Sequence, residues 1–321
     1  MQPVLKRVFV FEYLTGGGLV DSDEGAAPTL LPLGLQMRDA MVDDLLQAGG
    51  FAVSAATCSR APAPPAGALP CQARPGESMF ELVARQAALH DAVWLVAPET
   101  GGLLLQFAQQ VPAGRWLGCD AAAIRLASSK RATLVRLAAL GLSTPLAFEG
   151  LTPRWVVKPD DGAGAVATTV YRSLAAARNA QRAAGEGVMT LEPWVDGHPM
   201  SLSVLCRDGN AELLSINRQR IELTGDGRLS YAGVDVDRVP RDGPAGAALA
   251  KVAAQVARAM PGLRGFVGID LVWHARQGPV VIEVNPRVTC AYAGLSARLG
   301  RNLAAELLAD EARLERLHAD A

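Results

Sequence analysis

The chain has 321 residues, half of them hydrophobic, which is enough for two or three domains with separate cores. Its formal net charge of −1 gives no bulk attraction to nucleic acid or to an acidic membrane, and no apolar run is long enough for a secretion signal or a spanning helix. The five cysteines are scattered and form no Cys-x-x-Cys pair, so free thiols in the cytoplasm are expected.

Strands and helices alternate in the first third of the chain. The expected strands are 8–11, 51–55, 92–96 and 115–118, and the expected helices are 34–48, 77–89 and 103–110. Residues 60–76 are rich in Pro, Ala and Gly and are expected to form a loop. This alternation predicts an α/β domain with a parallel sheet over residues 1–120.

The rest of the chain mixes helices with hairpins. The expected helices are 121–140, 174–184, 244–260 and 295–308, and the expected strands are 154–158, 166–171, 188–195, 201–206, 211–216, 266–273 and 280–285. Residues 207–210 are a typical hairpin turn. The pattern predicts an α+β region with antiparallel sheets.

Two acids and an amide lie on the last predicted hairpin. If His274 faces Pro279, then Asp270 lies directly opposite Glu283. Opposed like charges destabilise a strand pair, and a cation between them removes the repulsion. Asn285 follows Glu283 by two residues and projects from the same face. These three oxygen ligands predict a magnesium site that bridges nucleotide phosphates.

Lysines and glycines form a candidate phosphate site. Lys158 ends a predicted strand, and Gly162 and Gly164 follow it. Glycines allow backbone N–H groups to approach phosphate oxygens, and a lysine adds a positive charge beside them. Lys130, at the start of a helical segment after Ser129, is a second candidate. An ordinary strand-end turn and a surface lysine are the alternatives.

Three further segments are candidates for ligand binding. Glu192 ends a predicted strand before Trp194 and Val195, so the acid would accept ribose hydroxyls and the backbone would read adenine. The glycines at 16–18 follow the first strand, where they form either a substrate cradle or a plain turn. Residues 217–220 follow a predicted strand, and their two arginines form either an anion site or a surface cluster.

In their order and spacing, these motifs resemble the ATP-grasp superfamily of carboxylate–amine ligases over about residues 120–310. The acids are thirteen residues apart, and the asparagine follows two residues later. The resemblance implies a pre-ATP-grasp α/β domain over 1–120 and an ATP-grasp domain over 121–321. It places a lid subdomain at about 145–200 and a metal-binding subdomain at about 201–310. It also implies ATP and two Mg²⁺ ions, with Mn²⁺ as a substitute.

The resemblance assigns a role to each candidate residue. The residues implied for ATP are Lys130, Lys158, Gly162, Gly164, Glu192, Trp194 and Val195, and those implied for the metal are Asp270, Glu283 and Asn285. Arg287, with Lys158, is implied to act on the transferred phosphoryl group. No side-chain nucleophile is required, and the sequence has no Gly-x-Ser-x-Gly or His-Glu-x-x-His motif.

Residues 8–18, 216–221 and 285–295 are similar to the tyramine–glutamate ligases of methanofuran synthesis and their bacterial relatives in methylofuran synthesis. This likeness implies that the γ-carboxylate of glutamate is joined to the amine of tyramine or tyrosine through an acyl phosphate, with release of ADP. The partners would be small molecules, and a homo-oligomer is left open. The alternatives are an ATP-binding module without catalysis, a ligase for another amino acid, and a dehydrogenase, although the first strand lacks a dinucleotide fingerprint.

Overall fold

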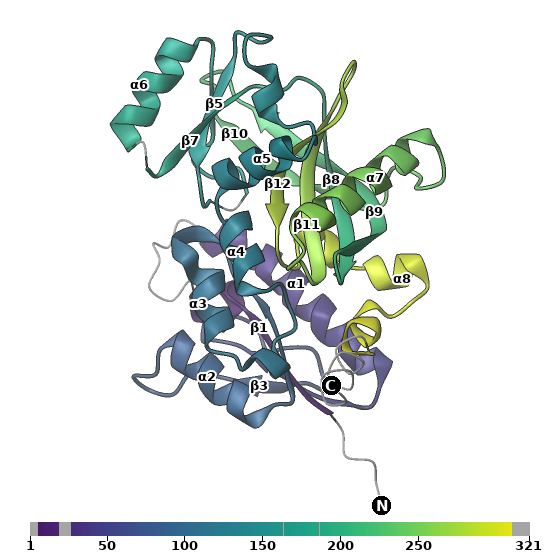
Figure 1. Cartoon of the computed structure of the whole chain (residues 1–321). Helices are drawn as coiled ribbons and strands as arrows, with labels where there is room; N and C mark the ends of the chain where they lie inside the picture. The colour runs from purple at the N-terminus through teal and green to yellow at the C-terminus, as the bar shows by residue number, and fades with distance from the viewer. Residues whose placement is uncertain (1–5, 19–26, 163, 186, 310–321) are drawn as a thin grey trace, which may run out of the picture. The chain divides into compact units, whose positions relative to one another are not determined.

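The computed structural model describes residues 6–18, 27–162, 164–185 and 187–309 (Figure 1). Its contacts divide the chain into two compact units. Unit 1 holds the described parts of Met1–Ala97, Leu103–Gly118 and Arg287–Ala321, and unit 2 holds Pro98–Gly102 and the described parts of Cys119–Pro286. No helix among the described residues is both long enough and apolar enough to cross a membrane.

Unit 1 is an α/β layer structure. Its elements are β1 (Lys6–Glu12), η1 (Leu14–Gly18), α1 (Ala27–Ala48), β2 (Phe51–Ala56), β3 (Leu69–Cys71), α2 (Met79–Leu89), β4 (Ala92–Val96), α3 (Leu103–Gln109), η3 (Ala113–Arg115), η5 (Cys290–Tyr292) and α8 (Leu295–Leu299). The sheet has the order β3-β2-β1-β4, and all its pairings are parallel. In Figure 1, α1 lies on one side of this sheet, and α2 and α3 lie on the other. The predicted parallel sheet with covered faces is confirmed.

The sequence signals for helix ends in unit 1 correspond to observed caps. α1 ends before Gly49 and Gly50, which both adopt positive φ, a conformation that glycine adopts without steric cost. α2 starts at a capping box, in which Ser78 accepts from the N–H of Glu81 and the Glu81 carboxylate accepts from the N–H of Ser78. These local signals explain why the end of α1 and the start of α2 were predictable to within two residues, whereas α1 begins at Ala27, before the expected start at residue 34.

Two predictions in unit 1 are wrong. The loop expected at 60–76 contains the edge strand β3, with Pro70 at its centre. Proline is tolerated there because an edge strand leaves one side unpaired. The strand expected at 115–118 is reduced to a single bridge between Trp116 and Val93, because η3 takes up Arg115.

The C-terminal segment belongs to unit 1, whereas the sequence placed all residues after 120 in one domain. Tyr292 and Ser296 donate hydrogen bonds to the buried carboxylate of Asp44 in α1, and Asn302 Nδ2 donates to the Asp44 carbonyl at 2.6 Å. The helix expected at 295–308 is also interrupted. α8 stops before Gly300, which has φ +65°, and helix resumes at 303–309.

Unit 2 contains two antiparallel sheets. Its elements are η2 (Thr100–Gly102), α4 (Ala121–Ala127), α5 (Lys130–Ala139), η4 (Pro145–Phe148), β5 (Trp155–Pro159), β6 (Thr169–Tyr171), α6 (Leu174–Ala184), β7 (Met189–Pro193), β8 (His198–Arg207), β9 (Asn210–Leu223), β10 (Leu229–Asp235), α7 (Pro244–Ala259), β11 (Gly265–His274) and β12 (Gly278–Asn285). A three-stranded sheet has the order β6-β5-β7, and a five-stranded sheet has the order β10-β9-β8-β11-β12. α6 packs on the former and α7 on the latter (Figure 1). The predicted α+β organisation is confirmed.

Two predictions in unit 2 are corrected, and one strand had not been predicted. The helix expected at 121–140 is two helices, because Ser129 acts as an N-cap and accepts from the N–H of Ala132. Residues 217–220 lie inside β9 and not after a strand. β10 was not expected, and it pairs with the far half of β9.

Candidate active site

The hairpin of β11 and β12 brings the two predicted metal ligands opposite each other. Asp270 pairs directly with Glu283, as expected. The tip differs from the prediction, because His274 pairs with Gly278 and not with Pro279. One extra residue in β12, at a bulge, shifts the register by one before Asp270 is reached. The two acids therefore share one face of the sheet.

A lysine lies beside this acidic pair. Lys130 Nζ is 3.1 Å from Glu283 Oε1 and also donates to the carbonyl of Gly162. The Lys130 side chain is 4% exposed and that of Glu283 is 13% exposed, so solvent screens the pair weakly. Lys130 is the first residue of α5, and the break after α4 gives it that position. A predicted phosphate ligand and a predicted metal ligand thus neutralise each other.

The pKa of Glu283 reflects competing neighbours. Burial raises the pKa above its ordinary value, while the ammonium groups of Lys130 and Lys158 lower it. The buried carboxylate of Glu99 raises it further. Glu99 was not among the predicted site residues, because it lies outside every motif and joins this unit only through the short segment Pro98–Gly102.

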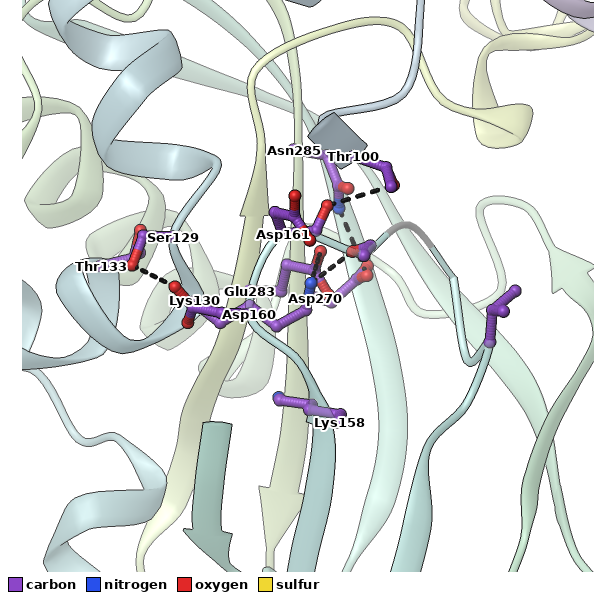
Figure 2. Close-up of polar contacts among 12 residues, drawn as sticks. Thr100, Ser129, Lys130, Thr133, Lys158, Asp160, Asp161, Asp270, Glu283 and Asn285 are labelled. Atoms are coloured by element: carbon purple, nitrogen blue, oxygen red, sulfur yellow. Dashed lines mark hydrogen bonds and ion pairs between the residues drawn. The ribbon is translucent and has the colours of Figure 1, made fainter. Parts of the chain in front are cut away.

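Both carboxylate oxygens of Asp270 accept hydrogen bonds from amides. Asn285 Nδ2 donates to Oδ2 at 3.3 Å, and Gln219 Nε2 donates to Oδ1 at 2.9 Å. Figure 2 shows Asn285, Asp270 and Glu283 close together, with Lys130 reaching in from α5. Gln219 was not among the predicted site residues, because the candidate anion site at 217–220 rested on the two arginines beside it. Arg218 and Arg220 are exposed, and Arg220 forms an ion pair with Asp235.

A second buried ion pair lies on the three-stranded sheet. Lys158 Nζ, on β5, is 2.9 Å from Glu192 Oε2 on β7, and both side chains are less than a tenth exposed. Lys158 and Glu192 are diagonal neighbours on one face of the sheet, because Lys158 pairs with Thr190 and Glu192 lies two residues further along β7. The candidate phosphate lysine and the candidate ribose acid are therefore brought together.

The loop that follows Lys158 is fixed on two sides. Asp160 accepts from Ser129 Oγ at 2.6 Å and from the N–H of Arg131 at 2.8 Å, next to Lys130 in α5. Asp161 accepts from the N–H of Gly101 at 2.8 Å, and its carbonyl accepts from Thr100 Oγ1 at 3.2 Å (Figure 2). These acids anchor the loop, a role that the spacing of lysine and glycines did not reveal.

Two glycines at the loop have local reasons to be glycine. A Cβ on Gly162 would lie 2.9 Å from Pro159 Cβ, too close for an ordinary contact. Gly164 adopts φ +65°, where L-residues are strained, and has open space around it. Both features are compatible with a loop that presents its backbone to a ligand.

The predicted adenine hinge is partly occupied by internal contacts. The N–H of Trp194 donates to the Arg154 carbonyl at 2.9 Å, and its ring N–H donates to Asp196 at 2.9 Å. The backbone N–H of Trp194 is therefore engaged, and Val195 remains the candidate for contact with adenine. Val195 is buried in an apolar cluster with Phe148 and Val280, which gives this end of the site a nonpolar wall.

Arg287 lies in unit 1, whereas the residues implied for ATP and for the metal lie in unit 2. Its guanidinium donates to the Val288 carbonyl at 3.2 Å. Its action on a phosphoryl group stays a prediction.

Unit 2 also has a pocket of about 290 Å³ on the five-stranded sheet. It is lined by His198, Pro199, Met200, Arg218, Gln219, Val239, Ala245 and Trp273. None of the predicted nucleotide or metal residues lines it, so it is not the candidate catalytic centre.

The donor set fits a magnesium ion. Two carboxylates and an amide oxygen are hard ligands, and Asn285 directs its NH₂ group at Asp270, which leaves its oxygen as an acceptor. The ammonium of Lys130 beside Glu283 indicates that this place is suited to positive charge. No group of three or more His, Cys, Asp or Glu side chains able to hold a metal occurs among residues 6–18, 27–162, 164–185 and 187–309.

Two family models match this chain. A family model described as "ATP-grasp domain" matches residues 127–291, just over half of the chain, and one described as "pre ATP-grasp 3 domain" matches residues 51–124. A search of curated protein sequences gave no match.

Solved structures with this fold include several proteins of low sequence identity. A putative ATP-grasp superfamily protein from Archaeoglobus fulgidus has TM-score 0.68 and 21% identity over 95% of this chain and 88% of its own. An L-amino acid ligase from Bacillus licheniformis has TM-score 0.61 and 16% identity over 91% and 68%. A D-alanine–D-alanine ligase from Bacillus anthracis, complexed with ATP, has TM-score 0.64 and 14% identity over 98% and 99%. At these identities the likeness shows the fold, and together with the family models it leads to one conclusion: the chain belongs to the ATP-grasp domain family.

Proposed function

We propose that this chain is an ATP-dependent ligase that joins a carboxylate, L-glutamate, to the amine of tyramine or tyrosine in methylofuran-type cofactor synthesis. The observation that carries the ligase proposal is the direct opposition of Asp270 and Glu283, with Asn285 on the same face and Lys130 beside them. Two carboxylates and an ammonium group removed from water cost stability unless they are compensated. A bound cation would compensate the carboxylates, and a phosphate would compensate the ammonium group.

The reaction has two steps. A carboxylate oxygen of the first substrate attacks the γ-phosphorus of ATP, the bond to the ADP oxygen breaks, and an acyl phosphate forms. The amine nitrogen then attacks the acyl carbon, phosphate leaves with the electron pair of the C–O bond, and the amine proton passes to solvent. A bound magnesium ion would neutralise charge on the phosphoryl oxygens.

The residues of this chain bind and orient the reactants. Lys130 and Lys158 exchange their carboxylate partners for phosphate oxygens, and Glu192 is then released to accept ribose hydroxyls. The loop with Gly162 and Gly164 covers the phosphates and excludes water, which would hydrolyse an acyl phosphate.

Two segments of the chain support the choice of substrates. Residues 216–221 and 285–295 resemble segments of tyramine–glutamate ligases, and two of the solved relatives are named as amino-acid ligases. Residues 216–221 lie on β9 and include Gln219, which contacts the acidic pair. A cytoplasmic location and assembly into a homo-oligomer belong to the same proposal.

The test measures ADP release with ATP, Mg²⁺, glutamate and either tyramine or tyrosine, and follows the amide product by mass. Release that depends on both substrates, and is lost in Glu283→Gln but kept in the exposed control Glu222→Gln, supports the proposal. ATP binding without turnover would support a noncatalytic module instead. Turnover with another amino acid would keep the reaction and replace the substrates.

A further inference from the structure

One glutamine in β9 contacts a carboxylate two strands away. Gln219 Nε2 lies 2.9 Å from Asp270 Oδ1, although the residues are 51 positions apart in the chain. β8 separates their strands in the sheet, so neither hairpin places them together. The contact depends on the register of three strands.

That register gives Gln219 its direction. Asp270 pairs with Ser201 on β8, and Ser201 pairs with Asn217 on β9, so the three side chains share one face. Gln219 follows Asn217 by two residues and therefore projects from the same face. Its exposed neighbour Arg218 projects from the other.

The strand that carries Gln219 is held in place by a buried network. Asn217 Nδ2 donates to Ser201 Oγ at 3.3 Å and to Ser203 Oγ at 3.2 Å, while Asn217 Oδ1 accepts from Ser215 Oγ at 2.9 Å and from the N–H of Asp237 at 3.0 Å. Asn217 and Ser215 are completely buried. A fully bonded amide of this kind rigidifies its surroundings, so Gln219 extends from a fixed base.

The two acids of the pair are held by chemically different groups. Glu283 is held by the ammonium of Lys130, which opposes its charge. Asp270 is held by two neutral amides, one on each oxygen. Hydrogen bonds to both oxygens restrict rotation of the carboxylate, which is otherwise broad for aspartate, and neutral donors do so without adding a positive charge.

We propose that Gln219 is a positioning residue that fixes the Asp270 carboxylate in the orientation in which it meets a divalent cation. The inference rests on the metal site of the proposed function. Partners of this kind, which hold a ligand without touching the metal, change metal affinity by roughly 10–100-fold when they are removed.

The test is the affinity for Mn²⁺, measured from the EPR signal of free Mn²⁺ with and without ADP. Gln219→Met keeps the length of the side chain and removes the donor. Gln277→Met is the matched control, because Gln277 is an exposed glutamine in the turn of the same hairpin that carries Asp270. We expect a rise of about 10-fold or more in the Mn²⁺ dissociation constant for Gln219→Met, no change for Gln277→Met, and equal thermal midpoints.

A second variant covers the case in which Gln219→Met folds poorly. Gln219→Lys keeps a donor to Asp270 but adds a positive charge, so it should fold at least as well as the wild type and bind Mn²⁺ still more weakly than Gln219→Met. Wild-type Mn²⁺ affinity in either Gln219 variant overturns the positioning role and leaves the metal site intact. Absence of Mn²⁺ binding by the wild-type protein overturns the metal site itself, and the positioning role with it.

Discussion

Replacement of Lys130 with methionine removes the ammonium group that lies 3.1 Å from Glu283. The remaining carboxylate is 13% exposed and lies near a second acid, Asp270, so it becomes a poorly compensated buried charge. Breaking a buried ion pair on one side costs about 3–5 kcal/mol. We expect a loss of about 3 kcal/mol, the lower end of that range, because Lys158 still lowers the pKa of Glu283.

The size of this loss depends on pH in a defined direction. Burial already raises the pKa of Glu283, and without Lys130 it rises further. An acid whose pKa is raised in the folded state holds its proton more tightly there than in the unfolded chain. Stability is therefore retained below the unfolded pKa and lost as pH rises through the folded pKa. The difference between variant and wild type should be small near the ordinary glutamate pKa of about 4.5 and larger at pH 8.

Urea unfolding followed by tryptophan fluorescence measures the effect, since three of the five tryptophans (Trp155, Trp194 and Trp273) lie in unit 2. Arg131→Met is the matched control, because Arg131 is exposed on the same helix. Saturating Mg²⁺ should recover about 2–3 kcal/mol of the loss at pH 8, as expected for a ligand at roughly 100 times its dissociation constant. An equal loss at both pH values, or an equal cost for Arg131→Met, would refute the reasoning.

Four other predictions concern groups that are buried or nearly so. Glu283→Gln should lower amine-dependent ADP release by about 100-fold or more, because the negative charge and one of the two carboxylate oxygens proposed to hold the metal are lost; a kcat within a few-fold of wild type would contradict this. Glu192→Gln should weaken ATP binding in calorimetry and leave Lys158 without its carboxylate partner, whereas unchanged affinity would remove Glu192 from the nucleoside site. Tyr292→Phe should cost about 1–3 kcal/mol in thermal unfolding, because the buried Asp44 loses a donor. Burial raises the pKa of Asp44, so that carboxyl costs stability as pH rises through its folded pKa, and Asp44→Asn should flatten the pH profile.

The candidate site was largely predictable, because its chemistry is concentrated on local elements. Asp270 and Glu283 belong to one hairpin, in which register follows from a short turn. The predicted pairing at the hairpin tip was wrong by one residue. A bulge between the tip and Asp270 shifts the register back, so that Asp270 pairs with Glu283 as predicted. A bulge depends on how two strands twist and pack, and the sequence carries no distinct signal for it.

The contacts between distant segments were not predictable. Lys130 was selected as a lone lysine, but its ion pair with Glu283 depends on the helix break at Ser129 and on how α5 packs against β12. The bond from Gln219 to Asp270 requires the register of β9, β8 and β11 together. Pairwise contacts over such separations are set by packing of the whole unit.

By itself the sequence determined which residue types carry charge, where strands and helices alternate, and which acids share one face of a hairpin. Hydrophobic periodicity and turn chemistry act over a few residues, so they are readable in the chain. Only the tertiary structure decided that the segment after Arg287 packs with α1, and that amides hold Asp270 while an ammonium holds Glu283. Those outcomes depend on burial, because a polar group removed from water takes whichever partner the fold brings within reach.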